Sequence, residues 1–242
     1  MSTQDKKTIE VCFSPVLYPY ILNNKDYITV IIDVLRATTS ICAALNNGAT
    51  KIIPVAALER AKELKEQGFT VAAERNGIKS DFADLGNSPF NFSENNVKGK
   101  DIVYSTTNGT MAIEMAMKNG PVIILSFNNL SAVANFLFEK RKNVLILCAG
   151  WKNKFNLEDS VCAGALVDKL CNKSGFAINC DAASASLDLW KLAKSDLSKY
   201  MEKALHRHRL KKMGLDDVLP LCFSIDTLDI VPVLKDGAIV KA

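Results

Sequence analysis

The sequence predicts an α/β protein in which helices cover both faces of a layered sheet. Short apolar runs alternate along the chain with stretches of helical periodicity, the pattern typical of this fold class. Residues 27–32 form an unbroken apolar run rich in β-branched side chains, as expected for a strand buried on both faces. With 242 residues and 48% hydrophobic content, the chain suits one α/β domain, or two small lobes with a site between them.

Strands and helices alternate as far as residue 172. Strands are predicted near 8–13, 27–33, 50–55, 69–73, 101–105, 121–126 and 144–149, and helices near 37–47, 57–67, 110–119, 129–140 and 158–172. Helical patterns dominate from about 182 to 213, and a hairpin within 230–240 follows, turning at Asp236-Gly237. We treat 1–242 as a single unit with a possible internal boundary near 175–180, where the pattern changes without a Pro- or Ser-rich linker.

The charge of the chain favours a small anionic ligand over a nucleic acid. Net charge is +4, and the basic residues are scattered except in residues 206–212. His206 and His208 are two apart and do not share a helix face, so we expect a solvated basic surface there and not a metal pair. No apolar stretch reaches the roughly 20 residues that span a bilayer, and residues 1–7 lack the apolar core of a signal peptide. We expect no membrane insertion.

The cysteines indicate a reducing cytoplasm. There are seven, an odd number, and none forms a C-x-x-C pair, so neither a disulfide framework nor a structural zinc site is expected. Cys42, Cys148 and Cys162 occupy apolar periodic positions, where burial in the core is the expected role.

Asp33 and Arg36 follow the buried strand directly. Ligands of open α/β sheets bind at the carboxyl ends of such strands, so both side chains are expected at the active edge of the sheet. Two plainer roles stay open: Asp33 as a cap of the helix that follows it, and Arg36 as a solvated surface residue.

A second polar segment, residues 105–110, ends another strand and precedes a helix. Backbone N–H groups at a helix N-terminus favour anions, and Gly109 permits close approach, so the segment resembles an anion cradle. The P-loop pattern is absent. The alternative is a turn followed by an ordinary Ser, Thr or Asn helix cap.

Two adjacent carboxylates, Glu158 and Asp159, stand where a helix begins. Across the sheet edge from Asp33, one of them would complete a hard-oxygen site for Mg²⁺. The alternative is that Asn156 and Asp159 form a capping pair, since acids are favoured in any first helical turn.

Arg75 and Asn76 also follow a strand and lie in a polar turn. The planar Arg75 guanidinium matches the geometry of an oxyanion, although most arginines are solvated. The loop at 84–89 has turn chemistry and lies over a site if these strand ends converge.

Together, five segments in this order resemble the 2-phosphosulfolactate phosphatase family, called ComB: residues 33–39, 74–77, 85–89, 105–110 and 148–159. The resemblance implies an α/β fold particular to that family. It also implies a Mg²⁺-dependent hydrolase that converts 2-phospho-3-sulfolactate to 3-sulfolactate and phosphate, a step toward coenzyme M. Not all bacterial relatives are tied to coenzyme M, so another phosphorylated hydroxy acid remains a possible substrate.

Under this hypothesis Mg²⁺ is held by Asp33 together with Glu158 and Asp159, and the catalytic residues are Asp33, Arg36 and Glu158. Substrate binding is assigned to a larger set of residues: Arg75, Asn76, Thr106, Thr107, Asn108, Gly109 and Thr110. A small cytoplasmic enzyme of this kind is expected to be a homodimer acting on an anionic small molecule.

Two rival functions remain. In the first, Asp33 is a covalent nucleophile as in haloacid-dehalogenase-type phosphatases, but Leu35 stands where those enzymes carry a second aspartate. In the second, the chain binds an anion without catalysis. The carboxylates beside the cradle weigh against this reading, because an anion binder gains nothing from them.

Overall fold

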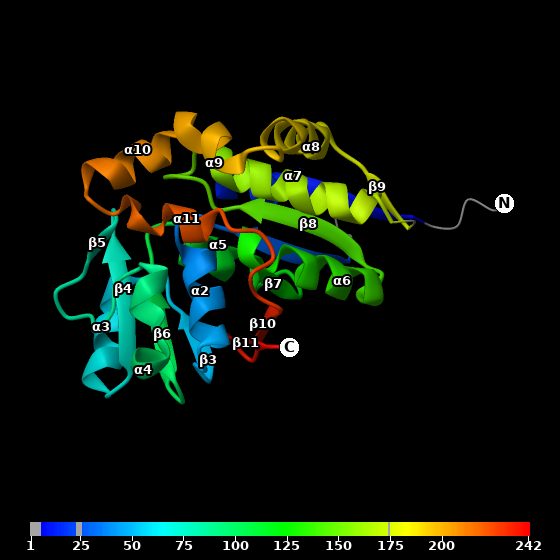
Figure 1. The fold of residues 1–242 in the computed structure, drawn as a ribbon. Coiled ribbons are helices and arrows are strands. Elements are labelled where there is room, and N and C mark those ends of the chain that lie inside the picture. Colours follow the sequence, from blue (N-terminus) through cyan, green and yellow to red (C-terminus); the bar gives the residue numbers. More distant parts are fainter. Residues whose placement is uncertain (1–5, 23–25, 174) are drawn as a thin grey trace.

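The computed structural model describes residues 6–22, 26–173 and 175–242, and within these ranges eleven strands join one mixed sheet (Figure 1). Its strand order is β5-β4-β6-β3-β11-β10-β7-β2-β8-β1-β9. The strands are β1 Lys7–Cys12, β2 Tyr27–Ile32, β3 Lys51–Pro54, β4 Thr70–Arg75, β5 Ile78–Lys79, β6 Asp101–Ser105, β7 Val122–Leu125, β8 Asn143–Cys148, β9 Phe176–Ile178, β10 Pro232–Lys235 and β11 Ala238–Lys241.

Parallel pairing falls into two groups of strands. One group comprises β4, β6 and β3, and the other comprises β7, β2, β8, β1 and β9. The hairpin β10–β11 lies between the groups, antiparallel to β7 on one side and to β3 on the other. The two groups therefore run in opposite directions across the hairpin.

Helices cover both faces of the second group. Side chains of its strands alternate between two hydrophobic clusters, as the period of a strand requires: Val30 and Ile32 belong to one, Ile31 to the other. The first cluster packs under α6 and α7, the second under α2 and α5. The longer helices are α2 Ala37–Asn46, α3 Leu58–Glu66, α5 Gly109–Ala116, α6 Leu130–Lys140, α7 Leu157–Cys171, α8 Asp181–Ala193 and α10 Leu205–Lys212.

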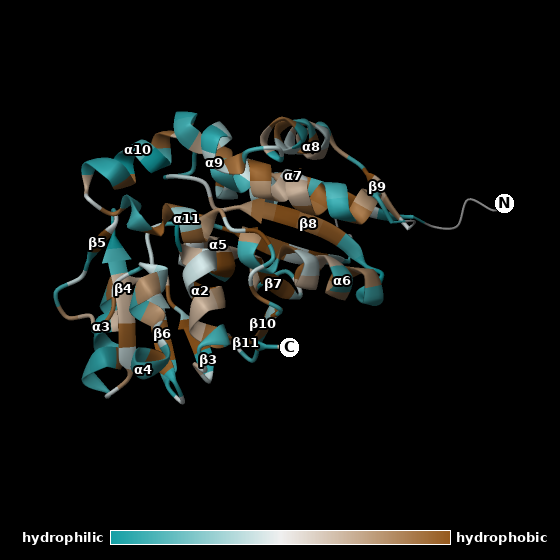
Figure 2. Ribbon diagram, in the orientation of Figure 1, coloured by the Kyte–Doolittle hydropathy of each residue, from teal (hydrophilic) through white to brown (hydrophobic). Residues whose placement is uncertain are grey.

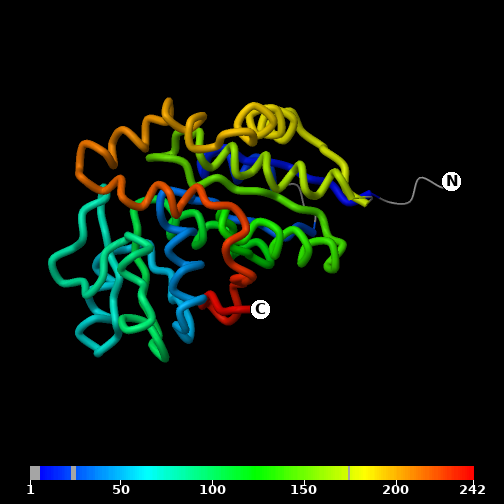
Figure 3. The backbone as a smooth tube through the Cα atoms, viewed as in Figure 1, coloured from blue at the N-terminus to red at the C-terminus, as the bar shows by residue number. Residues whose placement is uncertain are grey.

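Short helical segments complete the fold. They are α1 Tyr18–Ile21, α4 Glu94–Val97, α9 Leu197–Tyr200 and α11 Leu219–Cys222, with 3-10 turns η1 Pro15–Leu17, η2 Pro89–Phe92, η3 Phe127–Asn129, η4 Met201–Lys203 and η5 Asp216–Val218. The tube view shows residues 200–213 passing over the turn that joins β4 to β5 (Figure 3).

The predicted α/β class is confirmed, and each predicted strand and helix before residue 172 is present within a few residues. The predicted hairpin is also present, with Asp236 and Gly237 both at positive φ, as a two-residue hairpin turn requires. The strands β5 and β9 were not predicted because each is short and lacks a clear period. Since β9 pairs with β1, residues 176–178 extend the same sheet; the division into two lobes stays a prediction.

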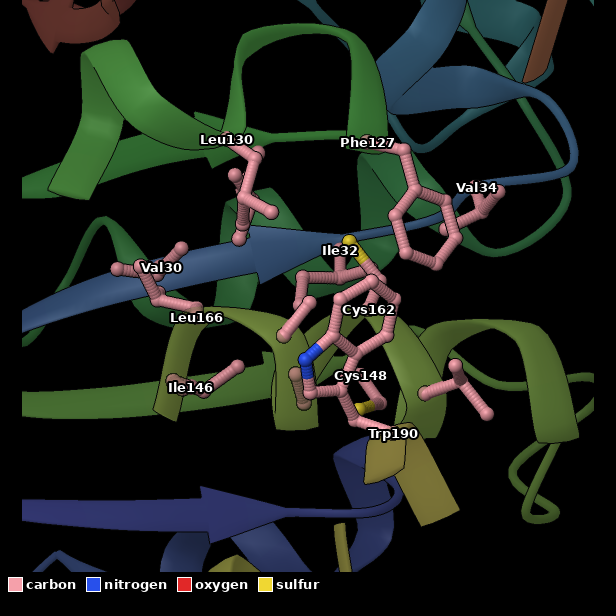
Figure 4. Close-up of a cluster of buried hydrophobic side chains, with 14 of the residues drawn as sticks. Val30, Ile32, Val34, Phe127, Leu130, Ile146, Cys148, Cys162, Leu166 and Trp190 are labelled. Atoms are coloured by element: carbon pink, nitrogen blue, oxygen red, sulfur yellow. The ribbon is translucent and has the colours of Figure 1, made fainter. Parts of the chain in front are cut away.

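The first cluster extends to the end of β2. Cys148 and Cys162 are fully buried there beside Trp190, and Cys42 is buried in the second cluster, which confirms their expected role (Figure 4).

Hydropathy colouring shows a brown β8 and a mostly teal α10, so the buried strand and the polar helix stand out plainly (Figure 2). No helix in the described ranges combines the length and apolar character needed to cross a bilayer.

The packing of α8 on α7 depends on Gly164. A Cβ added there would overlap the Ser186 carbonyl oxygen and approach the Trp190 Cβ within 2.9 Å. Because that obstacle is backbone, α8 itself must move to make room.

Gly164→Ala is therefore expected to lower the free energy of unfolding by about 3 kcal/mol, the cost of overpacking a rigid contact. Gly99→Ala is a suitable control, because its Cβ meets nothing within 4 Å and only the positive φ of 71° opposes it. Urea denaturation of both variants measures the difference. Equal losses would contradict the packing argument.

Candidate active site

A cavity of about 220 Å³ opens where strand ends from both groups meet α10. Its wall is formed by Asp33, Leu35, Arg36, Glu74, Asn76, Gly77, Asn87, Asn108, Trp151, His206, Arg209, Leu210, Lys212 and Met213. The lining residues before 152 lie at or just after the ends of β2, β4, β6 and β8, except Asn87, which lies in the loop after β5. The rest belong to α10 and the residue after it. The expected convergence of strand ends is thus present.

Asp33 follows β2 of one group and lies beside the start of α5, which follows β6 of the other group. It is 6% exposed, and the Ala37 backbone N–H at the start of α2 hydrogen-bonds its carboxylate. A Cβ added to Gly109, at the start of α5, would lie 3.0 Å from Asp33 Oδ2 and 2.6 Å from the Ala37 Cβ. Asp33 therefore lies against the starts of α2 and α5 and also lines the cavity, although the N-cap position of α2 belongs to Arg36.

Burial shifts the ionisation of these acids. It raises the pKa of Asp33 to about 6; His206 opposes this shift, while Glu74 and Glu158 add to it. Burial, followed by the charges of Asp33 and Glu158, raises the pKa of Asp159 well above its usual value. The site thus gathers more negative charge than this low-dielectric setting stabilises.

Asp159 ties the ends of two neighbouring strands together. Its Oδ1 accepts the Val34 N–H at 2.9 Å and its Oδ2 accepts the Gly150 N–H at 3.1 Å. The Asn156 side chain accepts the Asp159 N–H at 3.3 Å, as the capping alternative predicts. Asp159 is fully buried and does not line the cavity.

Glu158 contacts a histidine that the sequence reasoning placed in solvent. Its Oε1 lies 2.8 Å from His206 Nδ1, and its Oε2 is buried without a hydrogen-bond partner among the described residues. The His206 ring rests 5.2 Å from the Trp151 ring and lines the cavity. The expectation of a solvated His206 is wrong, because Glu158 and Trp151 enclose it; His208 is exposed as expected.

The two predicted arginines differ in position. Arg36 is 4% exposed, lines the cavity and donates from Nη2 to the Gly77 carbonyl at 3.1 Å. Arg75 donates to Ala56 O, Glu74 O and Ser105 Oγ, and it does not line the cavity. Arg36 thus faces the cavity, whereas Arg75 is bonded to neighbouring strand ends.

Most hydrogen bonds of the 105–110 segment are made within the segment or to Glu74. Thr106 and Thr110 each accept the other's N–H with a side-chain oxygen, at 3.2 and 3.1 Å. Glu74 accepts the Thr107 N–H at 2.7 Å and the Gly77 N–H at 2.6 Å. Of this segment, Asn108 lines the cavity.

Several lining residues escaped the sequence reasoning. Asn87 belongs to the loop at 84–89, which was suggested to lie over a site. Tyr104 Oη donates to Asn87 Oδ1, and Asn87 lines the cavity as that suggestion requires. Leu35, Trp151 and Arg209 had no local signal, because apolar and basic side chains in turns and helices are common everywhere. The contribution of α10 depends on how residues 180–213 cross the sheet.

Carboxylate oxygens suited to a hard cation are present at this site. Asp33 faces the cavity, and Glu158 Oε2 is a buried acceptor without a donor among the described residues. Among those residues no group of three or more His, Cys, Asp or Glu side chains is already arranged to hold a metal ion.

Comparison with known families decides the classification. Residues 13–237 match the family described as 2-phosphosulpholactate phosphatase. The chain belongs to this family. A Caldanaerobacter subterraneus relative is 38% identical over 219 residues, covering 89% of this chain and 90% of the relative. A Prochlorococcus marinus relative is 39% identical over 222 residues, and a Thermotoga maritima relative 36% over 211; each match covers 87% of this chain and 90% of the relative. All three are named probable 2-phosphosulfolactate phosphatase.

The resemblance to the 2-phosphosulpholactate phosphatase family stated from motifs is thus confirmed. Each of the five motif segments contributes to the cavity wall, through Asp33, Glu74, Asn87, Asn108 and Trp151 in chain order. Segments scattered over 120 residues of sequence therefore share one site.

In this protein without bound metal, Asp33→Asn is expected to raise the free energy of unfolding above neutral pH. The carboxyl pKa rises from 3.8 to about 6 on burial, so the charged form costs stability above pH 6, and this cost fades as the pH falls toward 4. A pKa shift of this size corresponds to a difference of about 3 kcal/mol in the free energy of unfolding. Urea denaturation in EDTA at several pH values measures it. A difference that does not change with pH would contradict the role of the buried charge.

Proposed function

We propose that the protein hydrolyses 2-phospho-3-sulfolactate to 3-sulfolactate and phosphate. Family membership and the names of the relatives support this activity. The observation that carries the proposal is that each family motif contributes at least one residue to the same cavity. The wall of this cavity contains carboxylates as well as arginine. Its volume suits a ligand smaller than the drug-sized molecules that occupy pockets of about 300 Å³ or more.

We further propose that the reaction depends on Mg²⁺, with Asp33, Glu158 and Asp159 as the carboxylates near the ion. The unpartnered Glu158 Oε2 and the raised pKa values of Asp33 and Asp159 support a missing positive charge here. Asp159 uses one lone pair of each oxygen on backbone N–H groups and keeps others. When bound, the ion would neutralise charge on the phosphate during displacement.

The protein's own groups would then position the ester. Arg36 lines the same cavity as Asp33, with its guanidinium held on the Gly77 carbonyl, and it would bind phosphate oxygens there. Glu158, fixed by His206, would orient the attacking water. Asn76 and Asn108 line the cavity, and the NH₂ groups of their side-chain amides would bind the anion.

The remaining predicted binding residues would shape this pocket. Thr106, Thr107 and Thr110 hold the cradle through their hydrogen bonds, Gly109 lets α5 approach Asp33, and Arg75 anchors the strand ends. We also propose that the two groups of strands act as two lobes with the substrate between them. Cytoplasmic location, a homodimer and a role in coenzyme M synthesis remain expectations from the sequence.

The first test is phosphate release from 2-phospho-3-sulfolactate by the purified protein, with Mg²⁺ and with EDTA, beside 2-phospholactate and an aryl phosphate. Release that needs Mg²⁺ and is fastest with the sulfonated ester is expected. Faster release from another ester would keep the phosphatase and change its substrate. Binding without release from any ester would favour the anion-binding alternative.

Asp33→Asn is expected to lower kcat by roughly 10³-fold, because it removes a carboxylate charge proposed to hold Mg²⁺ against the reacting phosphate. Asp188→Asn, an exposed acid on α8 paired with Lys191, is the matched control and should leave kcat unchanged. Mg²⁺ should raise the melting temperature of the wild type and not that of Asp33→Asn. A near-normal rate in the variant would remove Asp33 from the mechanism, and phosphate trapped on the Asp33 peptide would establish the covalent alternative.

A further inference from the structure

The cavity contains arginines from two separate elements. Arg36 comes from the end of β2, beside Asp33, and its guanidinium is anchored on the Gly77 carbonyl. Arg209 comes from α10, and its guanidinium carbon lies 4.3 Å from the centre of the Trp151 ring. The site therefore has a second strong cation that the reacting phosphate, placed next to Asp33, does not require.

Arg209 differs from the other arginines of the described residues because one of its nitrogens is buried without a partner. Its Nε is buried without a hydrogen-bond partner, and its guanidinium makes no hydrogen bond or ion pair within the described residues. Arg207, two residues earlier on the same helix, contacts Ser198 O at 3.5 Å and Glu202 at 3.9 Å. A buried donor with no acceptor is costly, so Arg209 gains from a ligand that supplies one.

The surroundings of Arg209 select the kind of ligand. Leu210, Met213 and Trp151 are apolar residues that line the cavity together with Arg209. Burial lowers the pKa of Arg209, although the Glu158 charge opposes this shift. A guanidinium is weakly hydrated and offers several donors in one plane. A sulfonate, whose single charge is spread over three oxygens, matches such a partner.

The shape of the substrate also calls for two cations. In 2-phospho-3-sulfolactate the phosphate and carboxylate share one carbon, while the sulfonate is attached one carbon further along. We propose that Arg209 is the specificity-determining residue of this site, binding the sulfonate and setting the preference for sulfonated over unsulfonated phosphate esters. This rests on the proposed function, since it names which group of that substrate α10 recognises.

The test compares two esters and three variants. Arg209→Met removes the charge and keeps an apolar stem against Trp151, Arg209→Lys keeps the charge and loses the planar fork, and Arg207→Met is the matched control. The esters are 2-phospho-3-sulfolactate and 2-phospholactate, which differ by the sulfonate. Steady-state rates give kcat and KM for each pair.

Arg209→Met is expected to lower kcat/KM for the sulfonated ester by roughly 10- to 100-fold, mainly through KM, since hydrogen bonds to charged groups contribute about 1.5–3 kcal/mol. With 2-phospholactate the same variant should match the wild type. Arg209→Lys should recover part of the loss, and Arg207→Met should change neither ester. Equal losses on both esters, or a loss confined to kcat, would overturn the proposal.

Binding separates this proposal from the proposed function. Calorimetry with 3-sulfolactate and lactate requires no turnover, so it applies even if the wild type releases no phosphate from either ester. Wild-type binding of 3-sulfolactate that Arg209→Met and Arg209→Lys weaken, with lactate binding unchanged, would support the role of Arg209. Equal binding in all variants, or no binding to the wild type, would refute it.

Discussion

Buried negative charge at the end of β2 is the constraint on which the site depends. Asp33, Glu158 and Asp159 are each at most 6% exposed, and each is stabilised by a different neighbour. The Ala37 backbone N–H lowers the pKa of Asp33, and His206 is hydrogen-bonded to Glu158. Backbone N–H groups just after β2 and β8 donate to Asp159. Removing water from like charges is costly, so such a cluster persists only where the surrounding backbone supplies donors.

The same acids organise the loops around them. By accepting from Val34 and Gly150, Asp159 fixes how the chain leaves two adjacent strands. Glu74 does the corresponding work in the other group of strands, accepting from Gly77 and Thr107. Carboxylates at strand ends thus set loop positions as well as charge, which explains why the cavity wall is largely built from backbone turns.

Prediction from sequence succeeded where local pattern determines structure. The strand at 27–32 and the hairpin turn at Asp236 follow from composition and turn chemistry, and motif order correctly gave the family. The position of Asp33 at a strand end likewise placed it at the cavity. These features depend on residues close together in the chain.

The failures share a different origin. His206 was assigned to solvent because its neighbours are basic, yet Glu158 and Trp151 enclose it from segments about fifty residues earlier. Arg36 was predicted to be catalytic and Arg75 to bind substrate, and no sequence signal shows that Arg36 lines the cavity while Arg75 donates to the Ala56 carbonyl outside it. Such distinctions arise from tertiary packing, which no local pattern encodes.

The hairpin β10–β11 has a consequence for how the molecule is made. Its strands, at 232–241, lie in the middle of the sheet, between β3 and β7, although they come last in the chain. During synthesis β3 and β7 leave the ribosome long before their partner, and each presents an unpaired edge until the hairpin arrives. Exposed edges invite pairing between chains, so this order of assembly makes the nascent protein most prone to aggregation just before synthesis of the hairpin.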